Sequence, residues 1–229
     1  MAMKKIIIVI TLILLNCSSH VKPTIYQPLH QELFDQINFA EYDKIMIVAH
    51  PDDETIWGGM HLLQDKYFVI CLTNGNNKVR ANEFMNVLKN TASFGIILDY
   101  PDKVNGKKDN WATCKDKIRN DLYYVLSKHS FNLIVTHNPD GEYGHIHHKM
   151  TNSIVTKIQE NLHATDKLYY FGKYHKKNSA YLPMTPTYDA KLLEEKNNLL
   201  KLYSSQKKVC KHLQHMFPYE YWISYQDWS

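Results

Sequence analysis

The chain has 229 residues, of which 44% are hydrophobic and 22% are charged, and this composition excludes a disordered chain and a polytopic membrane protein. The formal net charge is only +4, and the basic residues are scattered along the chain, which argues against an extended nucleic-acid-binding surface. We therefore expect a globular protein with no nucleic-acid partner.

The N-terminal segment has the pattern of a bacterial secretory leader. Two lysines precede the ten-residue apolar run 6–15, which is too short to span a bilayer as a helix. Residues 14–17 resemble a lipobox that ends at Cys17. We therefore predict that residues 1–16 are a signal peptide of the lipoprotein type and that lipidated Cys17 anchors the protein to the membrane of the cell envelope. The alternatives are a plain secretory signal, an anchor helix formed by the same segment, and a buried first strand.

The rest of the chain is predicted to be a linker, 17–40, which ends in a short amphipathic helix around residues 32–37, followed by one domain, 41–229. Within that domain, short apolar runs of strand length alternate with segments of helical periodicity. This alternation predicts an α/β, Rossmann-like three-layer fold with a mostly parallel, doubly wound sheet. The predicted strands are 44–49, 67–73, 96–100, 132–137 and 168–171. The predicted helices are one that starts near residue 54 and the segments 81–94, 110–128, 147–162 and 187–204.

Polar side chains follow several of the predicted strands. In a doubly wound sheet, ligands bind beyond the carboxyl ends of the strands, and with the strand order 3-2-1-4-5 the loops after the first and fourth strands are neighbours. The first loop begins with His50-Pro-Asp-Asp-Glu, and Asn74 follows the second strand. The loop after the fourth strand contains three histidines, His145, His147 and His148. We expect these loops to form one site.

Imidazole and carboxylate groups on two facing loops are the ligand types of an open catalytic zinc site, in which three protein ligands and one water surround the ion. A further carboxylate beside the ion can accept the proton of that water, which makes the water a nucleophile. The structural alternative is that Asp52 or Asp53 only caps the helix that starts near Glu54, and that the histidines are surface residues.

Two motifs carry a resemblance to a known family. Residues 49–54, Ala-His-Pro-Asp-Asp-Glu, and residues 144–148, Gly-His-Ile-His-His, resemble the paired signatures of the PIG-L/LmbE family of zinc-dependent de-N-acetylases. Arg-Ala-Asn-Glu at 80–83 and Tyr-Ser-Ser-Gln at 203–206 are similar to two further motifs of that family. Its members include N-acetylglucosaminyl-phosphatidylinositol deacetylases.

The resemblance implies roles for individual residues. His50, Asp53 and His148 would bind Zn²⁺, with Fe²⁺ as the alternative metal. Asp52 would be the general base that activates water. His145 would either stabilise the tetrahedral oxyanion or protonate the departing amine.

Four residues are predicted to bind the substrate. Arg80 has a planar guanidinium that suits sugar hydroxyls or a phosphate, and Tyr143 falls where some relatives place a tyrosine near the oxyanion. Asn74 and His147 complete this set through their positions after the second and fourth strands.

The sequence departs from the family pattern at His147. Many relatives have Asp or Asn there, and an Asp could orient and charge the preceding His145 in a way that imidazole cannot. Asp140 or Glu142 is the candidate substitute for that carboxylate.

Together these roles predict a hydrolase that removes the N-acetyl group from an N-acetylglucosamine-type sugar in a glycan or glycoconjugate and releases acetate. One alternative is a surface-anchored carbohydrate-binding lipoprotein without catalysis. The other is a deacetylase of a glycosylated inositol lipid, anchored by residues 1–16 and facing the cytosol. The intact set of candidate ligands with Asp52 beside them argues against a pure binding protein, because binding alone requires no base next to a metal ligand.

Overall fold

The structure is a computed structural model and describes residues 28–180 and 185–228, so the predicted signal peptide and Cys17 lie outside the described residues. The strands are β1 (Lys44–Val48), β2 (Phe68–Thr73), β3 (Phe94–Tyr100), β4 (Lys103–Val104), β5 (Lys107–Lys108), β6 (Leu133–Thr136), β7 (Leu168–Tyr170) and β8 (Ile223–Ser224). The helices are α1 (Gln31–Asp35), α2 (Asp53–Gln64), α3 (Lys78–Leu88), α4 (Lys115–Lys128), α5 (Ile146–Asn161), α6 (Ala190–Lys201) and α7 (Lys207–Leu213). Short 3-10 turns lie at Phe39–Glu41, Thr165–Lys167, Ser204–Gln206 and Gln214–Met216.

Six strands form one sheet in the order β3-β2-β1-β6-β7-β8, and β4 and β5 form a separate hairpin. All neighbours in the six-stranded sheet are parallel except β8, which pairs antiparallel with β7 at the edge. The strand order reverses between β1 and β6, so the loops that follow these two strands flank the usual ligand position of a doubly wound sheet. The predicted fold class is therefore confirmed, and each of the five predicted strands is a strand of this sheet.

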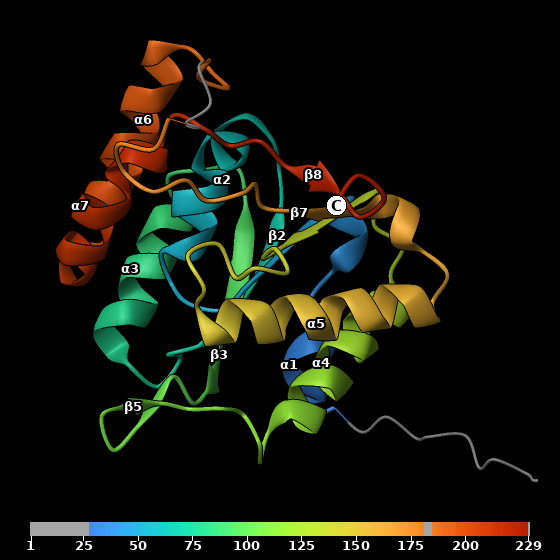
Figure 1. Cartoon of the computed structure of the whole chain (residues 1–229). Coiled ribbons are helices and arrows are strands. Elements are labelled where there is room, and N and C mark those ends of the chain that lie inside the picture. The colour runs from blue at the N-terminus through green and yellow to red at the C-terminus, as the bar shows by residue number, and fades with distance from the viewer. Residues whose placement is uncertain (1–27, 181–184, 229) are drawn as a thin grey trace, which may run out of the picture.

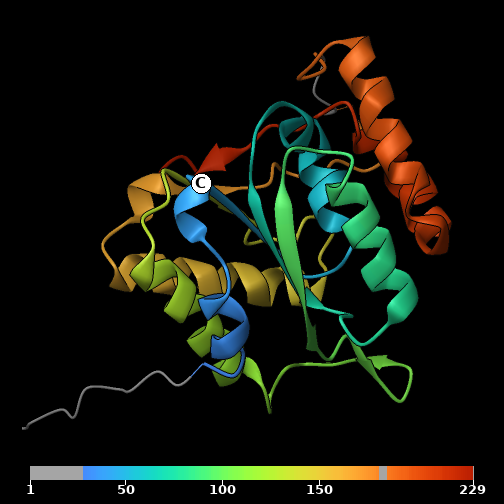
Figure 2. The ribbon, with the colours of Figure 1, turned by 180° about the vertical axis from the view of Figure 1, so that it is seen from behind.

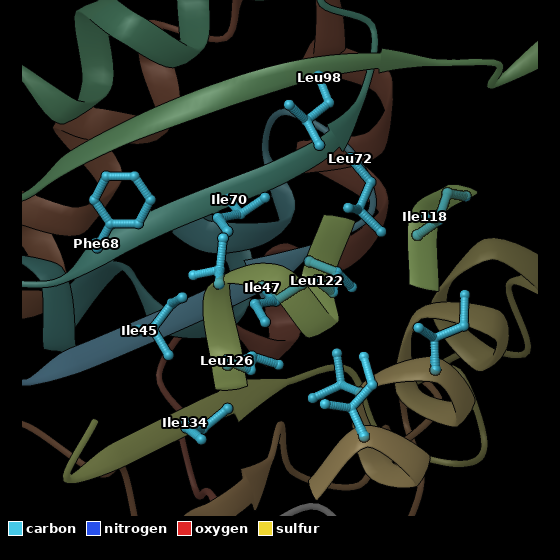
Figure 3. Close-up of a cluster of buried hydrophobic side chains, with 14 of the residues drawn as sticks. Ile45, Ile47, Phe68, Ile70, Leu72, Leu98, Ile118, Leu122, Leu126 and Ile134 are labelled. Carbon is cyan, nitrogen blue, oxygen red and sulfur yellow. The ribbon is translucent and has the colours of Figure 1, made fainter. Parts of the chain in front are cut away.

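Helices cover both faces of the sheet, with α1, α4 and α5 on one side and α2, α3, α6 and α7 on the other (Figures 1 and 2). In β1, Ile45 and Ile47 pack toward the first group of helices. Met46 and Val48 pack toward the second group. Figure 3 shows the first of these two cores, in which Leu122 of α4 lies against the strand side chains. Because successive side chains of a strand point to opposite faces, burial on both sides explains the continuous apolar runs.

The predicted helix 81–94 differs from the observed helix at both ends, because α3 spans Lys78–Leu88 and Phe94 already begins β3. The side chain of Asn77 accepts hydrogen bonds from the first backbone N–H groups of α3 and so fixes its start. Thr91, predicted on the helix, lies in the turn after it and donates its hydroxyl hydrogen to a backbone carbonyl. Within the described residues, no helix combines the length and apolar composition that crossing a bilayer requires.

The segment before β1 contains the short helix predicted around residues 32–37, but it packs on the domain and is not a separate linker. Residues 31–41 form α1 and a 3-10 turn, and Phe34 and Phe39 are each only 2% exposed within the first core. The backbone N–H of His30 also donates to the buried carboxylate of Asp121 in α4, at 3.0 Å. Burial of these two aromatic rings makes the described part of the segment an integral part of the domain.

A hairpin that was not predicted from the sequence lies between β3 and α4. Its strands β4 and β5 pair antiparallel, with Lys103 opposite Lys108. Asn105 and Gly106 both have positive φ, 51° and 76°, as a type I′ turn requires, and Asn-Gly is the residue pair most typical of that turn. Because the hairpin follows the carboxyl end of β3, it borders the edge of the sheet where the candidate site lies (Figure 1).

Candidate active site

Three side chains from the two predicted loops converge beyond the carboxyl ends of β1 and β6. His50 follows β1, Asp53 begins α2, and His148 lies in the first turn of α5. Nδ1 of His50 lies 3.1 Å from Oδ2 of Asp53 and 3.3 Å from Nε2 of His148. The Asp53 oxygen and the His148 nitrogen are 3.3 Å apart, and all three side chains are buried.

This donor set fits a metal ion. Ligand atoms that surround a tetrahedral zinc ion at 2.0–2.1 Å are roughly 3.3 Å from one another, which agrees with the three observed separations. Two imidazole nitrogens and one carboxylate oxygen are also a ligand combination found in catalytic zinc sites, where the fourth position stays open. His50, Asp53 and His148 can therefore hold a metal ion.

Asp52 and Asp53 are adjacent, but their carboxylates face different partners. Oδ2 of Asp53 faces the two histidines, whereas Oδ2 of Asp52 lies 3.7 Å from Nη2 of Arg80. Asp52 has a φ of 120°, which is unusual for a residue other than glycine, and its side chain makes no capping hydrogen bond to α2. The alternative that Asp52 only caps the helix is therefore wrong. Its carboxylate instead lines the same cavity as the candidate ligands.

Burial acts on the pKa values of these two carboxyl groups. It raises the pKa of Asp52 well above its ordinary value, and the neighbouring Asp53 carboxylate raises it further. Burial would also raise the pKa of Asp53, but the positive charge of His148 outweighs it and holds that pKa well below the ordinary value. Asp52 and Asp53 therefore differ in the pKa of their carboxyl groups as well as in the partners that these groups face.

Glu142 orients the candidate ligand His148 from the side away from the cavity. Its Oε2 lies 2.5 Å from Nδ1 of His148 and 3.1 Å from Nδ1 of His137. Burial alone would raise the pKa of Glu142, but the two histidines lower it to about 2. A carboxylate in this position fixes the tautomer of a metal-binding histidine and increases its basicity. Glu142 was expected to act on His145, and the structure instead places it on His148.

His137 was not among the predicted site residues, although it directly follows β6. Its ring is fully buried and stacks on His148, with ring centroids 3.9 Å apart. Nε2 of His137 accepts the backbone N–H of Ala49, so its Nδ1 donates to Glu142. His137, Glu142 and His148 thus form a closed hydrogen-bonded group that supports the candidate metal site.

Among the described residues, the structure places His147 outside the cavity wall, which does not support its predicted role in binding the substrate. Its ring is fully buried behind His50 and stacks on Trp111, with ring centroids 4.5 Å apart and an interplanar angle of 4°. Within the described residues, the cavity wall includes His50 and His145 but not His147. The first turn of α5 directs this side chain inward, toward the loop that precedes α4.

The hydrogen bonds of His147 determine which nitrogen of His50 is free. Nε2 of His147 lies 2.7 Å from the carbonyl oxygen of Asp109, and Nδ1 lies 3.0 Å from Nε2 of His50. A carbonyl oxygen only accepts, so Nε2 of His147 has the hydrogen and Nδ1 accepts from His50. Burial lowers the pKa of both histidines, that of His50 to about 4, so both rings are neutral at pH 7. The lone pair of His50 therefore lies on Nδ1, the atom that faces the other two candidate ligands.

His145 presents one nitrogen to the cavity. It is the N-cap residue of α5, and its Nδ1 accepts the backbone N–H of His147 at 3.3 Å. Burial lowers the pKa of His145 to about 2, so the ring is neutral and has its hydrogen on Nε2. His145 lines the cavity together with Tyr143, which is 39% exposed at the rim. An N–H group in this position can donate to a developing oxyanion.

The candidate site opens into two adjacent cavities. The inner one has a volume of about 240 Å³ and contains the candidate ligands His50 and Asp53 in its wall. The outer one has a volume of about 690 Å³ and extends past the carboxyl ends of β2 and β3. Among the predicted substrate residues, Arg80 lines both cavities, Tyr143 lines the inner one and Asn74 lines the outer one. The residues common to both walls are Arg80, Asp102, Lys103 and Gln206.

The two shorter motifs hold the C-terminal segment against the site. Ser205 donates its hydroxyl hydrogen to Glu83 at 2.6 Å, and Tyr203 donates to the buried Glu54 at 2.6 Å. These bonds fix the segment against α3 and α2 and place Gln206 in the cavity wall. No role was predicted for Glu54 or Gln206, although both stand within the quoted motifs, which were the available signal.

Comparison with known proteins agrees with this geometry. Residues 45–159, which are 115 of the 229 residues, match the sequence model of a family described as PIG-L, GlcNAc-PI de-N-acetylase. The matched segment contains Asp52 and all three candidate metal ligands. The chain belongs to the PIG-L family. This is a family of hydrolytic deacetylases whose members are typically metal-dependent.

A viral relative of the PIG-L chain is also known. A protein of Acanthamoeba polyphaga mimivirus, "Uncharacterized protein L374", is 34% identical over 133 residues. The aligned region covers 51% of this chain and 57% of the viral protein. The chain therefore spans little more than half of the length of this relative, whose printed name states no activity.

Proposed function

We propose that the protein is a metal-dependent hydrolase that removes the N-acetyl group from an N-acetylglucosamine-type sugar of a glycan or glycoconjugate. The observation that supports this most is the triangle formed by His50, Asp53 and His148, with Asp52 and His145 in the same cavity. Zn²⁺ is the proposed metal because two nitrogens and one oxygen in tetrahedral spacing suit it, and Fe²⁺ is the alternative. The proposed products are acetate and the free amino sugar.

The proposed reaction begins with the positioning of the acetamide group. His50, Asp53 and His148 would hold a divalent ion, which would supply Lewis acidity to polarise the acetamide carbonyl and lower the pKa of water. Asp52 stands beside these ligands and accepts a proton from the attacking water. As the tetrahedral carbon forms, Nε2–H of His145 donates to the oxygen that becomes negative.

The proton that Asp52 accepts from water is used again in the last step of the reaction. When the C–N bond breaks, Asp52 delivers its proton to the departing nitrogen, so the sugar leaves as an amine and acetate is the second product. His145 was expected either to stabilise the oxyanion or to protonate the amine. Its neutral ring and its single free N–H favour the first of these roles.

One experiment distinguishes the proposed deacetylase from a carbohydrate-binding protein without catalysis. Acetate release is measured from a panel of N-acetylhexosamine conjugates, including a glycosylated inositol lipid, with metal-reconstituted protein. We expect the wild type to release acetate, and Asp52→Ala to keep its metal and to lose roughly 10²- to 10⁴-fold in rate. Absence of acetate from every conjugate, with metal bound, would refute the proposal.

We also propose that the protein is exported and anchored at the cell envelope through lipidated Cys17. Mass spectrometry of the mature protein is expected to find Cys17 at the N-terminus with lipid attached. Detection of an intact, unmodified N-terminus would instead support the membrane-anchored enzyme that retains residues 1–16.

A further inference from the structure

The connection between β3 and α4 forms a closed base below the β4–β5 hairpin. The indole Nε1–H of Trp111 donates to the carbonyl of Pro101 at 2.8 Å. The backbone N–H of Asp109 donates to the carbonyl of Asp102 at 2.9 Å. These two hydrogen bonds join the start of the connection to its end, so Asp102 and Asp109 lie side by side where the hairpin begins and ends.

The ring of His147 is held by this closed base. Its Nε2–H donates to the carbonyl of Asp109 at 2.7 Å, and the ring stacks on Trp111. Trp111 is fully buried and has a φ of 54°, a backbone conformation that is uncommon for an aromatic residue. Such a conformation persists only where the surrounding structure fixes it. The base therefore keeps Nδ1 of His147 directed at His50.

The carboxylate of Asp102 faces the hydrogen bond between His50 and His147. Its Oδ1 lies 3.6 Å from Nε2 of His50 and 3.7 Å from Nδ1 of His147, and these two nitrogens are 3.0 Å apart. The Asp102 side chain is only 20% exposed, and within residues 28–180 and 185–228 it forms no ion pair with a lysine or an arginine. The nearest partners of this negative charge are therefore the two histidine rings.

The charge of Asp102 should stabilise the metal-bound state of His50. Burial lowers the pKa of both histidines, and Asp102 is among the groups that oppose this effect at each ring. The cause is that a nearby carboxylate stabilises positive charge on an imidazole. A metal ion at Nδ1 of His50 would make the ring more positive and its Nε2–H a stronger donor. A negative charge beside that N–H then favours the metal-bound state over the metal-free one.

We propose that Asp102 is a positioning residue for the candidate metal ligand His50. Its carboxylate strengthens the hydrogen bond from Nε2–H of His50 to His147 and thereby increases the affinity of the site for a divalent cation. The inference rests on the metal site of the proposed function. It assigns Asp102 to the metal ligand even though the residue also lines both cavities.

The affinity of the full chain for Zn²⁺, measured by competition with a chelator and without substrate, tests this role. Asp102→Asn removes the charge, keeps the size of the side chain and leaves the backbone carbonyl that binds Asp109. We expect it to bind Zn²⁺ about tenfold more weakly than the wild type, as is typical when the support of a metal-binding histidine is lost. Asp102→Glu keeps the charge and should recover part of the lost affinity.

Asp99→Asn is the matched control. Asp99 lines the outer cavity together with Asp102, but its Oδ1 faces His30, at 3.4 Å from Nε2. The substitution therefore removes the same charge from the same wall and leaves His50 and its partners in place. It should bind Zn²⁺ as tightly as the wild type does.

The Nε2–H proton of His50 provides a spectroscopic test in the Zn²⁺-loaded protein. A strong hydrogen bond shifts the resonance of an imidazole proton to low field, so Asp102→Asn should move this resonance to higher field and Asp99→Asn should not. A side chain that only stabilised the fold would instead lower the free energy of unfolding of the metal-free protein and leave the resonance in place. Urea unfolding of the metal-free variants measures that free energy.

Two results would overturn the role of Asp102. One is equal Zn²⁺ affinity in the wild type and Asp102→Asn, including the case in which only the KM for acetate release rises, which would assign the carboxylate to the substrate. The other is an equal loss of affinity in Asp99→Asn. If the wild type binds Zn²⁺ but releases no acetate from any conjugate, the proposed deacetylase fails and the affinity test of Asp102 still decides its role. If the wild type binds no divalent cation, the metal site and this inference fail together.

Discussion

Two buried charged clusters of this molecule differ in whether their partners are complete. In the first, Nζ of Lys196 lies 2.6 Å from the Glu220 carboxylate and donates to the carbonyls of Ile56 and Phe217 at 2.7 and 3.0 Å. The Glu220 carboxylate also accepts the backbone N–H of Met60. Each charge is therefore neutralised within the protein, and the pair joins α2 and α6 to the C-terminal segment.

The candidate metal site has the opposite character. Its three ligand atoms, from His50, Asp53 and His148, are all atoms that bind cations, and they face one another at 3.1–3.3 Å. Burial would lower the pKa of His148, but Asp53 and Glu142 raise it to about 10, so an imidazolium supplies positive charge when no metal is bound. The comparison shows that the charges of the Lys196–Glu220 pair neutralise each other within the protein. The three candidate ligands instead surround a position that a cation can occupy.

The largest expected effect is the loss of a ligand. His148→Ala should lose the bound metal and at least about 10³-fold in acetate release, because Lewis-acid activation contributes several kcal/mol to the rate. The wild type should also be stabilised by metal, by about 2.7 kcal/mol at a concentration of 100 times Kd, and the variant should not. Metal analysis and thermal unfolding with and without metal measure both effects.

His61→Ala is the control for this variant, because it removes a partly buried histidine that stacks on Trp222 away from the site. It should bind metal as the wild type does. If His148→Ala retained full metal content and metal-dependent stabilisation, the ligand assignment would be wrong.

Substitutions in the Lys196–Glu220 pair should change the stability of the protein and leave metal binding unchanged. Lys196→Met leaves the Glu220 carboxylate buried without its partner, so we expect a loss of about 3–5 kcal/mol in the free energy of unfolding. The double variant with Glu220→Gln should recover part of that loss. Urea unfolding of the metal-free proteins measures both values. A loss below about 1 kcal/mol for Lys196→Met would contradict the contrast between the two clusters.

A smaller effect, on metal affinity, is expected from substitution of His147, which supports His50. His147→Ala removes the acceptor of the His50 Nε2–H, and loss of such a supporting bond typically weakens metal binding by about 10- to 100-fold. His147→Asn places an amide oxygen near the position of Nδ1 and should retain most of the affinity. Competition with a chelator measures the affinity, and nitrogen NMR shows which nitrogen of His50 is protonated. Equal affinity in the wild type and His147→Ala would exclude this role.

The smallest effect concerns the segment before β1. The hydrogen bond and charge of Asp121 raise the pKa of His30 above 6.5, against the effect of burial. Because the folded-state pKa is the higher one, the stabilisation is fully present below pH 6.5 and is lost as the pH rises through the folded-state pKa. We expect about 1 kcal/mol or less, because burial of the ring, whose side chain is only 19% exposed, opposes the stabilising effect of Asp121. Urea unfolding of the wild type and His30→Gln should show a difference that shrinks as the pH rises, and a constant difference would contradict the pairing.

The strands and the meeting of the two loops could be predicted because they depend on local patterns. Continuous apolar runs such as 45–49 indicate strands buried on both faces, and the strand order brings the two loops together whatever their side chains do. The partner of each side chain could not be predicted in the same way. The roles of Glu142 and His147 depend on how α5 is rotated and on the irregular loop at Asp109, which no local pattern specifies.

The hairpin and the segment before β1 each have a local signal in the sequence. The hairpin was indicated by Asn105-Gly106, a pair typical of type I′ turns, but its strands are only two residues long and show no alternation. The amphipathic pattern around residues 32–37 predicted a helix that contains Phe34, but it did not predict that Phe34 and Phe39 pack on the core. Their burial depends on α4 and β2, which are distant in the sequence.

The central claim is that metal binding and proton transfer belong to different, adjacent residues. Metal content and acetate release, measured on the same samples of wild type, Asp52→Ala and His148→Ala, test it most directly. Asp52→Ala should contain as much metal as the wild type and lose roughly 10²- to 10⁴-fold in rate, whereas His148→Ala should lose both. Undiminished acetate release by Asp52→Ala, or loss of metal from that variant, would contradict the assignment.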